Sequence, residues 1–163
     1  MKKLLLVVDF QNDFVDGALG FDGAFKLDEV IVEKIEKYLK NGDDIIFTLD
    51  THDDNYLNTQ EGKRLPIPHC IKDTAGHEVY GKVSNYLKDA KKVFTKNTFG
   101  SLDLGNYLKE QNYSLIELAG LVTNMCVISN AIIAKSALPE ARIVVDRNAS
   151  MSFNDDLHNK TFE

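Results

Sequence analysis

The chain has 163 residues, of which 44% are hydrophobic, so it is long enough to bury one sizeable core and short for two. Its formal net charge is −6 and no block of lysine and arginine occurs, which argues against nucleic acid as a partner because phosphate binding needs a clustered basic surface. The apolar start MKKLLLVV ends at Asp9, too early for a signal peptide. We expect one domain over residues 1–163 that binds a small molecule and no membrane; a homo-oligomer is left open.

Short apolar runs rich in β-branched residues alternate with helical patterns along the chain. The predicted strands are KLLLVVDF (3–10), DIIFTLD (44–50), KVFTK (92–96), SLIELAGLV (114–122) and ARIVVD (141–146), and their lack of polar alternation is typical of strands buried on both faces. Apolar residues at helical spacing predict a helix over 27–42 that ends at Gly42, and weaker helices over 77–90 and 101–112. This order predicts an α/β fold: a three-layer α/β/α sandwich with a doubly wound, mainly parallel sheet.

The irregular stretch of residues 51–76 is longer than a simple connection between a strand and a helix. Long ordered loops in compact domains usually carry function. We expect part of the functional site here.

Four chemically active residues follow four different predicted strands. Asp9, Asp50 and Lys96 end the first three strands, and Cys126 comes a few residues after the fourth. Ligands of open parallel sheets bind beyond the carboxyl ends of the strands, so we expect these side chains to converge there.

Cys126 lies at the start of a predicted helix over 125–138. If Thr123 or Asn124 caps this helix, the sulfur lies in the first turn, where the helix dipole and a nearby Lys96 would lower the pKa of the thiol. Asp9 could take the thiol proton and return it to a leaving group. Each residue alone has an ordinary structural explanation; their common position favours a nucleophilic triad.

A second cluster combines Asp50, His52 and His69. Asp50 and His52 point to the same side of an extended backbone, and His69 could complete a site with open positions suited to zinc, manganese or iron. We expect His77 and His158 to be solvated. Asp146 is interpreted as a structural residue that ends its strand.

The two cysteines, Cys70 and Cys126, are too few for a disulfide framework, so we expect free thiols in a reducing cytoplasm. For Cys70, packing is favoured over metal binding.

Five motifs in order resemble the cysteine hydrolases of the isochorismatase-like superfamily, and most of all the nicotinamidases: VVDFQNDFVDGAL, TLDTHDD, PIPHCIKDTAGHE, VFTKNTFGS and GLVTNMCVISNA. The resemblance implies an amidohydrolase that converts nicotinamide to nicotinate and ammonia through a cysteine thioester. It assigns catalysis to Asp9, Lys96 and Cys126, and a divalent metal, zinc before manganese or iron, to Asp50, His52 and His69.

The resemblance also implies finer details of the site. Backbone N–H groups of Thr123 and Cys126 would form an oxyanion hole, and a cis peptide bond would fall at Val122–Thr123 beside the substrate. Phe14 would either stack on the substrate ring or pack in the core.

The chain departs from the family pattern in three places. It has no tryptophan and carries Pro66-Ile67-Pro68 ahead of His69, so the ring pocket is expected to differ. Asn58 lies near the position of a fourth metal ligand and is a poor substitute, which favours a water. By this resemblance we expect the chain to stop within the family's final helix and to lack its last strand. Two alternatives stay open: hydrolysis of another small amide or carbamoyl compound, and a small-molecule-binding member without activity.

Overall fold

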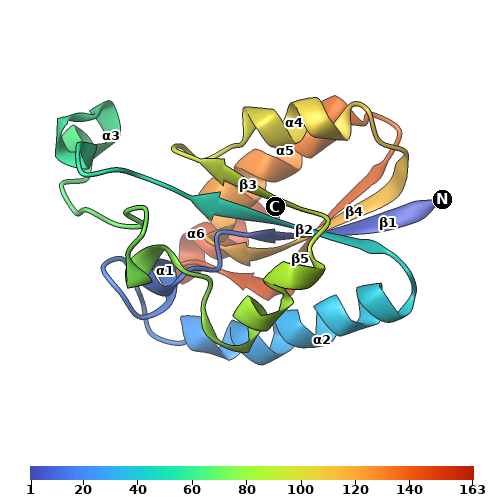
Figure 1. Cartoon of the computed structure of the whole chain (residues 1–163), viewed down its shortest axis with the longest axis horizontal. Helices are drawn as coiled ribbons and strands as arrows, with labels where there is room; N and C mark the ends of the chain where they lie inside the picture. Colours follow the sequence, from blue (N-terminus) through green and yellow to red (C-terminus); the bar gives the residue numbers. More distant parts are fainter.

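Five parallel strands form one sheet in the order β3-β2-β1-β4-β5 in the computed structural model, which describes residues 1–163 (Figure 1). The strands are β1 (Lys2–Val8), β2 (Asp44–Asp50), β3 (Lys92–Lys96), β4 (Tyr113–Leu121) and β5 (Arg142–Met151). All five expected strands are therefore present, and the parallel sheet confirms the predicted fold class.

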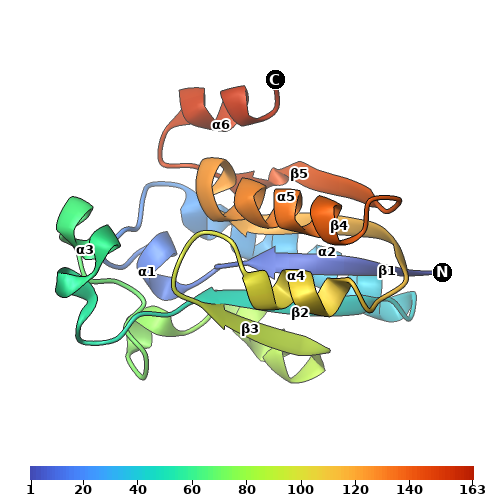
Figure 2. The same ribbon diagram turned by 90° about the horizontal axis from the view of Figure 1, so that it is seen from above.

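Two hydrophobic clusters, one on each face of the sheet, explain why the central strands lack polar alternation, whereas the edge strands β3 and β5 are largely exposed or half-buried and not buried on both faces as expected. Leu5 and Val7 of β1 contribute to the cluster under α2 (Leu27–Lys40), whereas Leu4 and Leu6 contribute to the cluster under α4 (Leu102–Leu108) and α5 (Ile128–Ala137). Figures 1 and 2 show α2 on one face and α4 with α5 on the other. Successive strand residues point to opposite faces, so both sides of β1 must be apolar.

The remaining helices are short. They are α1 (Asn12–Val15), α3 (Gln60–Arg64), α6 (Asp155–Thr161) and the 3₁₀ helices Ala24–Lys26, Tyr56–Asn58, Ala75–His77 and Gly81–Asp89. Figure 1 shows α1 and α3 beyond the carboxyl ends of the strands. The long stretch 51–76 thus has secondary structure of its own. No helix has both the length and the apolar character needed to span a membrane.

Two sequence-based expectations for the elements were wrong in detail, and one was confirmed. The helix expected over 77–90 is a 3₁₀ helix from Gly81 to Asp89. The helix expected over 27–42 does end at this glycine: Asn41 is the cap, and Gly42 follows it with a φ of 74°, the left-handed conformation typical of a glycine after a helix. Strand β5 continues past Asp146 to Met151, and Asp146 forms an ion pair with Lys34 at 2.5 Å, so it does not end the strand.

Gly120 near the end of β4 brings this strand close to β1. Its φ is 124°, and a Cβ atom at this position would lie 2.0 Å from the carbonyl oxygen of Val8. Only glycine fits so close an approach at this φ. The carboxyl ends of β1 and β4, which lead to Asp9 and Cys126, are thereby held side by side.

Candidate active site and metal centre

The site lies where the strand order changes direction. From β1 the chain builds β2 and β3 on one side and β4 and β5 on the other, which makes the end of β1 the switch point at which open α/β sheets bind ligands. Asp9 follows β1 and Cys126 lies in the π-helical turn Thr123–Val127 that follows β4. The structure therefore brings the predicted residues to one edge.

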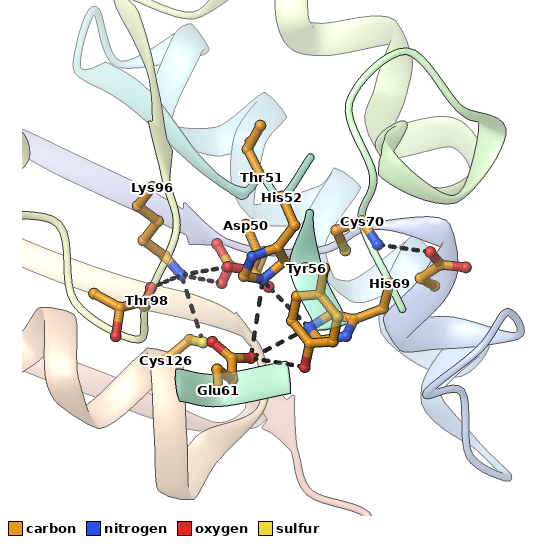
Figure 3. A network of polar contacts seen from close by, with 12 residues as sticks. Asp50, Thr51, His52, Tyr56, Glu61, His69, Cys70, Lys96, Thr98 and Cys126 are labelled. Carbon is orange, nitrogen blue, oxygen red and sulfur yellow. Dashed lines mark hydrogen bonds and ion pairs between the residues drawn. The ribbon is translucent and has the colours of Figure 1, made fainter. Parts of the chain in front are cut away.

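Asp9, Lys96 and Cys126 form one cluster, in which Lys96 contacts the other two residues (Figure 3). Its Nζ donates to Asp9 Oδ2 at 2.5 Å, to the carbonyl oxygen of Thr98 at 2.8 Å and to Cys126 Sγ at 3.5 Å. The second carboxylate oxygen of Asp9 accepts from the hydroxyl of Thr48 at 2.8 Å. Asp9, Lys96 and Cys126 are all buried, so their charges act in a medium that screens them weakly.

The charge state of the cluster differs from the sequence-based expectation. Burial raises the pKa of the Cys126 thiol well above its usual value, and the negative charge of Asp9 raises it further, although Lys96 lowers it. Burial also raises the pKa of Asp9, against the attraction of Lys96. Burial disfavours a charged Lys96, but Asp9 and its other anionic neighbours outweigh this and raise its pKa. The shift at Cys126 thus favours a neutral thiol, which lies beside the contact between Lys96 and Asp9.

The turn that carries Cys126 corrects two further expectations. The cis peptide bond lies at Leu121–Val122, one residue before the expected position. Neither Thr123 nor Asn124 caps a helix: the hydroxyl of Thr123 lies 2.8 Å from His158 Nδ1, and Asn124 Oδ1 accepts from the hydroxyl of Ser152 at 2.7 Å. His158 is half-buried in this contact and was wrongly expected to be solvated.

The predicted metal ligands form a second buried cluster. Asp50 Oδ2 lies 3.0 Å from His52 Nε2 and 3.2 Å from His69 Nε2 (Figure 3), and one potential ligand atom from each residue lies within 4.8 Å of the others. Burial would raise the pKa of Asp50, but the hydrogen bonds from both histidines hold it at about 2. One carboxylate and two imidazoles suit zinc, manganese or iron, so the donor set fits a divalent metal.

Glu61 joins this cluster and was missed. Its Oε1 lies 3.6 Å from His69 Nε2 and 3.9 Å from His52 Nε2, because the short helix α3 folds back over the cluster. Asn58, expected nearest to a fourth ligand position, instead donates to Asn55 Oδ1 at 2.8 Å and is exposed. No spacing in the sequence distinguishes Glu61 from the other acidic residues of this stretch.

Gln11 holds the backbone of Asp50 and was also missed. Its Oε1 accepts from the Asp50 N–H at 2.8 Å, and its Nε2 donates to the Asp50 carbonyl at 2.9 Å. The side chain of Gln11 is fully buried, so both hydrogen bonds are shielded from water. Asp50 is thus fixed by two backbone contacts in addition to its histidine partners.

The other residues named from the sequence lie around these two clusters. Cys70 is fully buried and outside the metal cluster, as expected for packing, and its N–H donates to Asp13. His77 was wrongly expected to be solvated: its Nε2 lies 2.8 Å from the hydroxyl of Thr51. The ring of Phe14 lies 5.6 Å from that of His69, and Val122 is buried in the core.

A pocket of about 830 Å³ opens over the metal cluster. It is lined by residues of α3, of the segment between β2 and α3, of the loop after β3 and of the turn after β4, including His52, Tyr56, Glu61, Phe99 and Met125. Met125 directly precedes the cysteine. A small molecule in this pocket would meet the metal cluster on one side and the Cys126 turn on the other.

The chain is similar to proteins of known families over nearly its whole length. The isochorismatase domain matches residues 3–163. A Bacillus subtilis (strain 168) protein described as the uncharacterized isochorismatase family protein PncA is 34% identical over 170 residues, which are 97% of this chain and 91% of the relative.

Solved structures share the fold. A crystal structure of nicotinamidase/pyrazinamidase PncA from Bacillus subtilis has a TM-score of 0.88 and 34% identity, with 99% of this chain and 93% of that chain covered. A crystal structure of pyrazinamidase/nicotinamidase from Streptococcus mutans UA159 has a TM-score of 0.87 and 31% identity at the same coverage of 99% and 93%. The similarity includes the strands and turns that carry both clusters.

Proposed function

Because the chain belongs to the isochorismatase family and is a hydrolase of amide C–N bonds, we propose that its substrate is nicotinamide, which it converts to nicotinate and ammonia. Cys126 is the nucleophile, Asp9 the general acid and base, and Lys96 the cation that stabilises both. The observation that carries the proposal is the chain of contacts from Asp9 through Lys96 to Cys126 beside a pocket.

The first half of the reaction forms a thioester. Asp9 takes the proton of the Cys126 thiol as the sulfur attacks the carboxamide carbon, and the carbonyl oxygen becomes an oxyanion held by backbone N–H groups of Thr123 and Cys126. One such donor is typically worth about 10²- to 10³-fold in rate. The C–N bond then breaks, and ammonia leaves with the proton that Asp9 had taken.

The second half releases the acid. Asp9 takes a proton from a water molecule as its oxygen attacks the thioester carbon. The C–S bond breaks, the carboxylic acid leaves, and the proton on Asp9 returns to the sulfur. Lys96 remains charged throughout, since Asp9 raises its pKa and its Nζ contacts both reacting groups.

Asp50, His52 and His69 would hold a divalent metal, zinc before manganese or iron, with Glu61 as a fourth ligand. Such a metal would supply a Lewis acid for a nitrogen donor of the substrate ring, and the three ligands would fix where that ring lies. Phe14 and Val122 border the substrate in this proposal. A reducing cytoplasm suits the enzyme, because Cys126 and Cys70 are both free thiols.

The test is ammonia release from nicotinamide, with zinc or manganese supplied, by this chain and by Cys126→Ala. We expect turnover in the first and a loss of at least about 10³-fold in the second. If a folded, metal-loaded wild type does not hydrolyse nicotinamide, the substrate is wrong. Turnover of another small amide or carbamoyl compound would then identify the alternative in the same family.

A further inference from the structure

Two hydrogen bonds connect the end of the chain to the turn that carries Cys126. His158 of α6 contacts the hydroxyl of Thr123 at 2.8 Å, and Ser152, just before α6, donates to Asn124 at 2.7 Å. Figure 2 shows α6 apart from the layers that sandwich the sheet. The contacts of its histidine with the turn therefore serve a purpose other than covering the sheet.

Each contact has one partner that is shielded from water. Thr123 is fully buried and Ser152 is 6% exposed. Within the turn, the N–H groups of Met125 and Val127 both donate to the carbonyl of Val122, at 3.1 and 3.2 Å. Side-chain contacts at positions 123 and 124 add restraints on the peptide groups that precede the nucleophile.

Contacts other than the one with Thr123 also fix the position of the His158 ring. It packs against Phe162 with the ring centroids 5.2 Å apart, and Asn154 caps α6 by accepting from the N–H of Leu157 at 3.0 Å. Burial and the positive charge of Arg147 lower the pKa of His158, against Asp155, so the ring stays neutral at pH 7. A neutral Nδ1 can accept the hydroxyl proton of Thr123.

We propose that His158 is a positioning residue of the reaction: through the Thr123 hydroxyl it fixes the turn so that the backbone N–H groups and the sulfur of Cys126 face the carbonyl of the substrate. Ser152 supports the same turn through Asn124. The inference rests on the proposed thioester chemistry. Small displacements of a positioned group cost about 10²-fold in rate when they reach about 1 Å, so a hydrogen bond outside the pocket can act on turnover.

The experiment compares three substitutions of His158. In His158→Asn the side-chain amide can place a polar atom where Nδ1 lies, in His158→Gln it places one where Nε2 lies, and His158→Leu has neither. We expect His158→Leu and His158→Gln to lower kcat for nicotinamide by about 10-fold or more with KM changed by less than about 2-fold, and His158→Asn to stay within about 3-fold of wild type. In a Thr123→Val background, His158→Leu should cause little additional loss, because the shared contact is already absent.

Melting temperatures of all variants separate positioning from stability. The proposal is overturned if His158→Leu turns over like the wild type, or if the three variants lose activity only in proportion to their loss of melting temperature. The rate at which iodoacetamide modifies Cys126, mapped by mass spectrometry, gives a readout that does not need nicotinamide. If the wild type does not hydrolyse nicotinamide, the proposed function is wrong, but the modification rate still tests the inference. Similar rates in the wild type and His158→Asn, with different rates in His158→Leu and His158→Gln, support the inference. Equal rates in all four proteins overturn it.

Discussion

At the scale of the residue, Cys126 is a protonated thiol rather than the preformed thiolate that a helix start would favour. The turn is π-helical and buried, so removal from water dominates over any helix dipole. The neighbouring Asp9 and Lys96 already form an ion pair, and a thiol proton can pass to Asp9 within the cluster. In the proposed reaction the thiolate is therefore generated only as the sulfur attacks the substrate.

Glu61 is predicted to contribute to metal affinity. In Glu61→Gln the carboxylate beside His52 and His69 is lost, and we expect zinc affinity to fall by about 10- to 100-fold, the range seen when groups that support a metal site are removed. Titration with a competing chelator measures this. Asn58→Ala is the matched control, because Asn58 bonds only to Asn55, and its affinity should be unchanged. Equal zinc affinities in Glu61→Gln and Asn58→Ala would show that Glu61 does not contribute to the metal site.

At the scale of the element, Gly120 is predicted to be essential for the contact between β4 and β1. Gly120→Ala places a Cβ atom 2.0 Å from the Val8 carbonyl oxygen at a φ of 124°, so we expect a loss of at least about 3 kcal/mol or failure to fold. Gly42→Ala has a φ of 74° with no atom within 4 Å and should cost only about 1 kcal/mol. Urea unfolding of both variants gives the comparison, and similar small losses would contradict the account.

Asp44 at the start of β2 is predicted to make stability depend on acid pH. Partial burial raises its pKa, but hydrogen bonds from Lys91, Tyr113 and Lys2 outweigh this and lower it to about 2. Folding therefore favours the charged form, and the stabilisation is complete above the unfolded pKa of about 4 and lost as the pH falls through about 2.

Asp44→Asn should accordingly lower the free energy of unfolding by about 1 to 2 kcal/mol at pH 7, a value that is reduced because Lys2 is exposed. The difference in stability between this variant and the wild type should shrink below about pH 4. Urea unfolding between pH 7 and pH 3 measures it, with the exposed Asp22→Asn as control. A difference that stays constant with pH would show that shape rather than charge matters at Asp44.

At the scale of the whole molecule, metal binding is predicted to stabilise the fold, because the ligands come from β2 and from the long segment before β3. Free zinc at 100 times its Kd would add about 2.7 kcal/mol, or about 5 to 10 °C in melting temperature. Circular dichroism with zinc and with a chelator measures the shift, and His69→Ala should abolish it. An equal shift in His69→Ala would indicate that zinc binds elsewhere.

The sheet and the converging site could be predicted because the local sequence pattern indicates which segments form strands and where those strands end. Lys96 ends its strand, Asp9 and Cys126 follow theirs, and parallel strands align such positions at one edge. The same local logic could not predict that α3 folds Glu61 onto the histidines, or that α6 brings His158 to Thr123, since both depend on tertiary contacts.

The predictions that were wrong in detail also failed because the outcome depends on tertiary contacts. The segment 77–90 has helical spacing, yet it forms a 3₁₀ helix packed against α2. The pKa of Cys126 was expected to fall from its position at a helix start, whereas burial beside Asp9, a tertiary feature, raises it.

The most direct test of the account is to catch the thioester. Rapid mixing of the metal-loaded chain with nicotinamide, followed by acid quench and mass spectrometry, should reveal a nicotinoyl group on the peptide that contains Cys126, and none on Cys126→Ala. Turnover without any adduct, together with ammonia release by Cys126→Ala, would show that a group other than this sulfur attacks the amide.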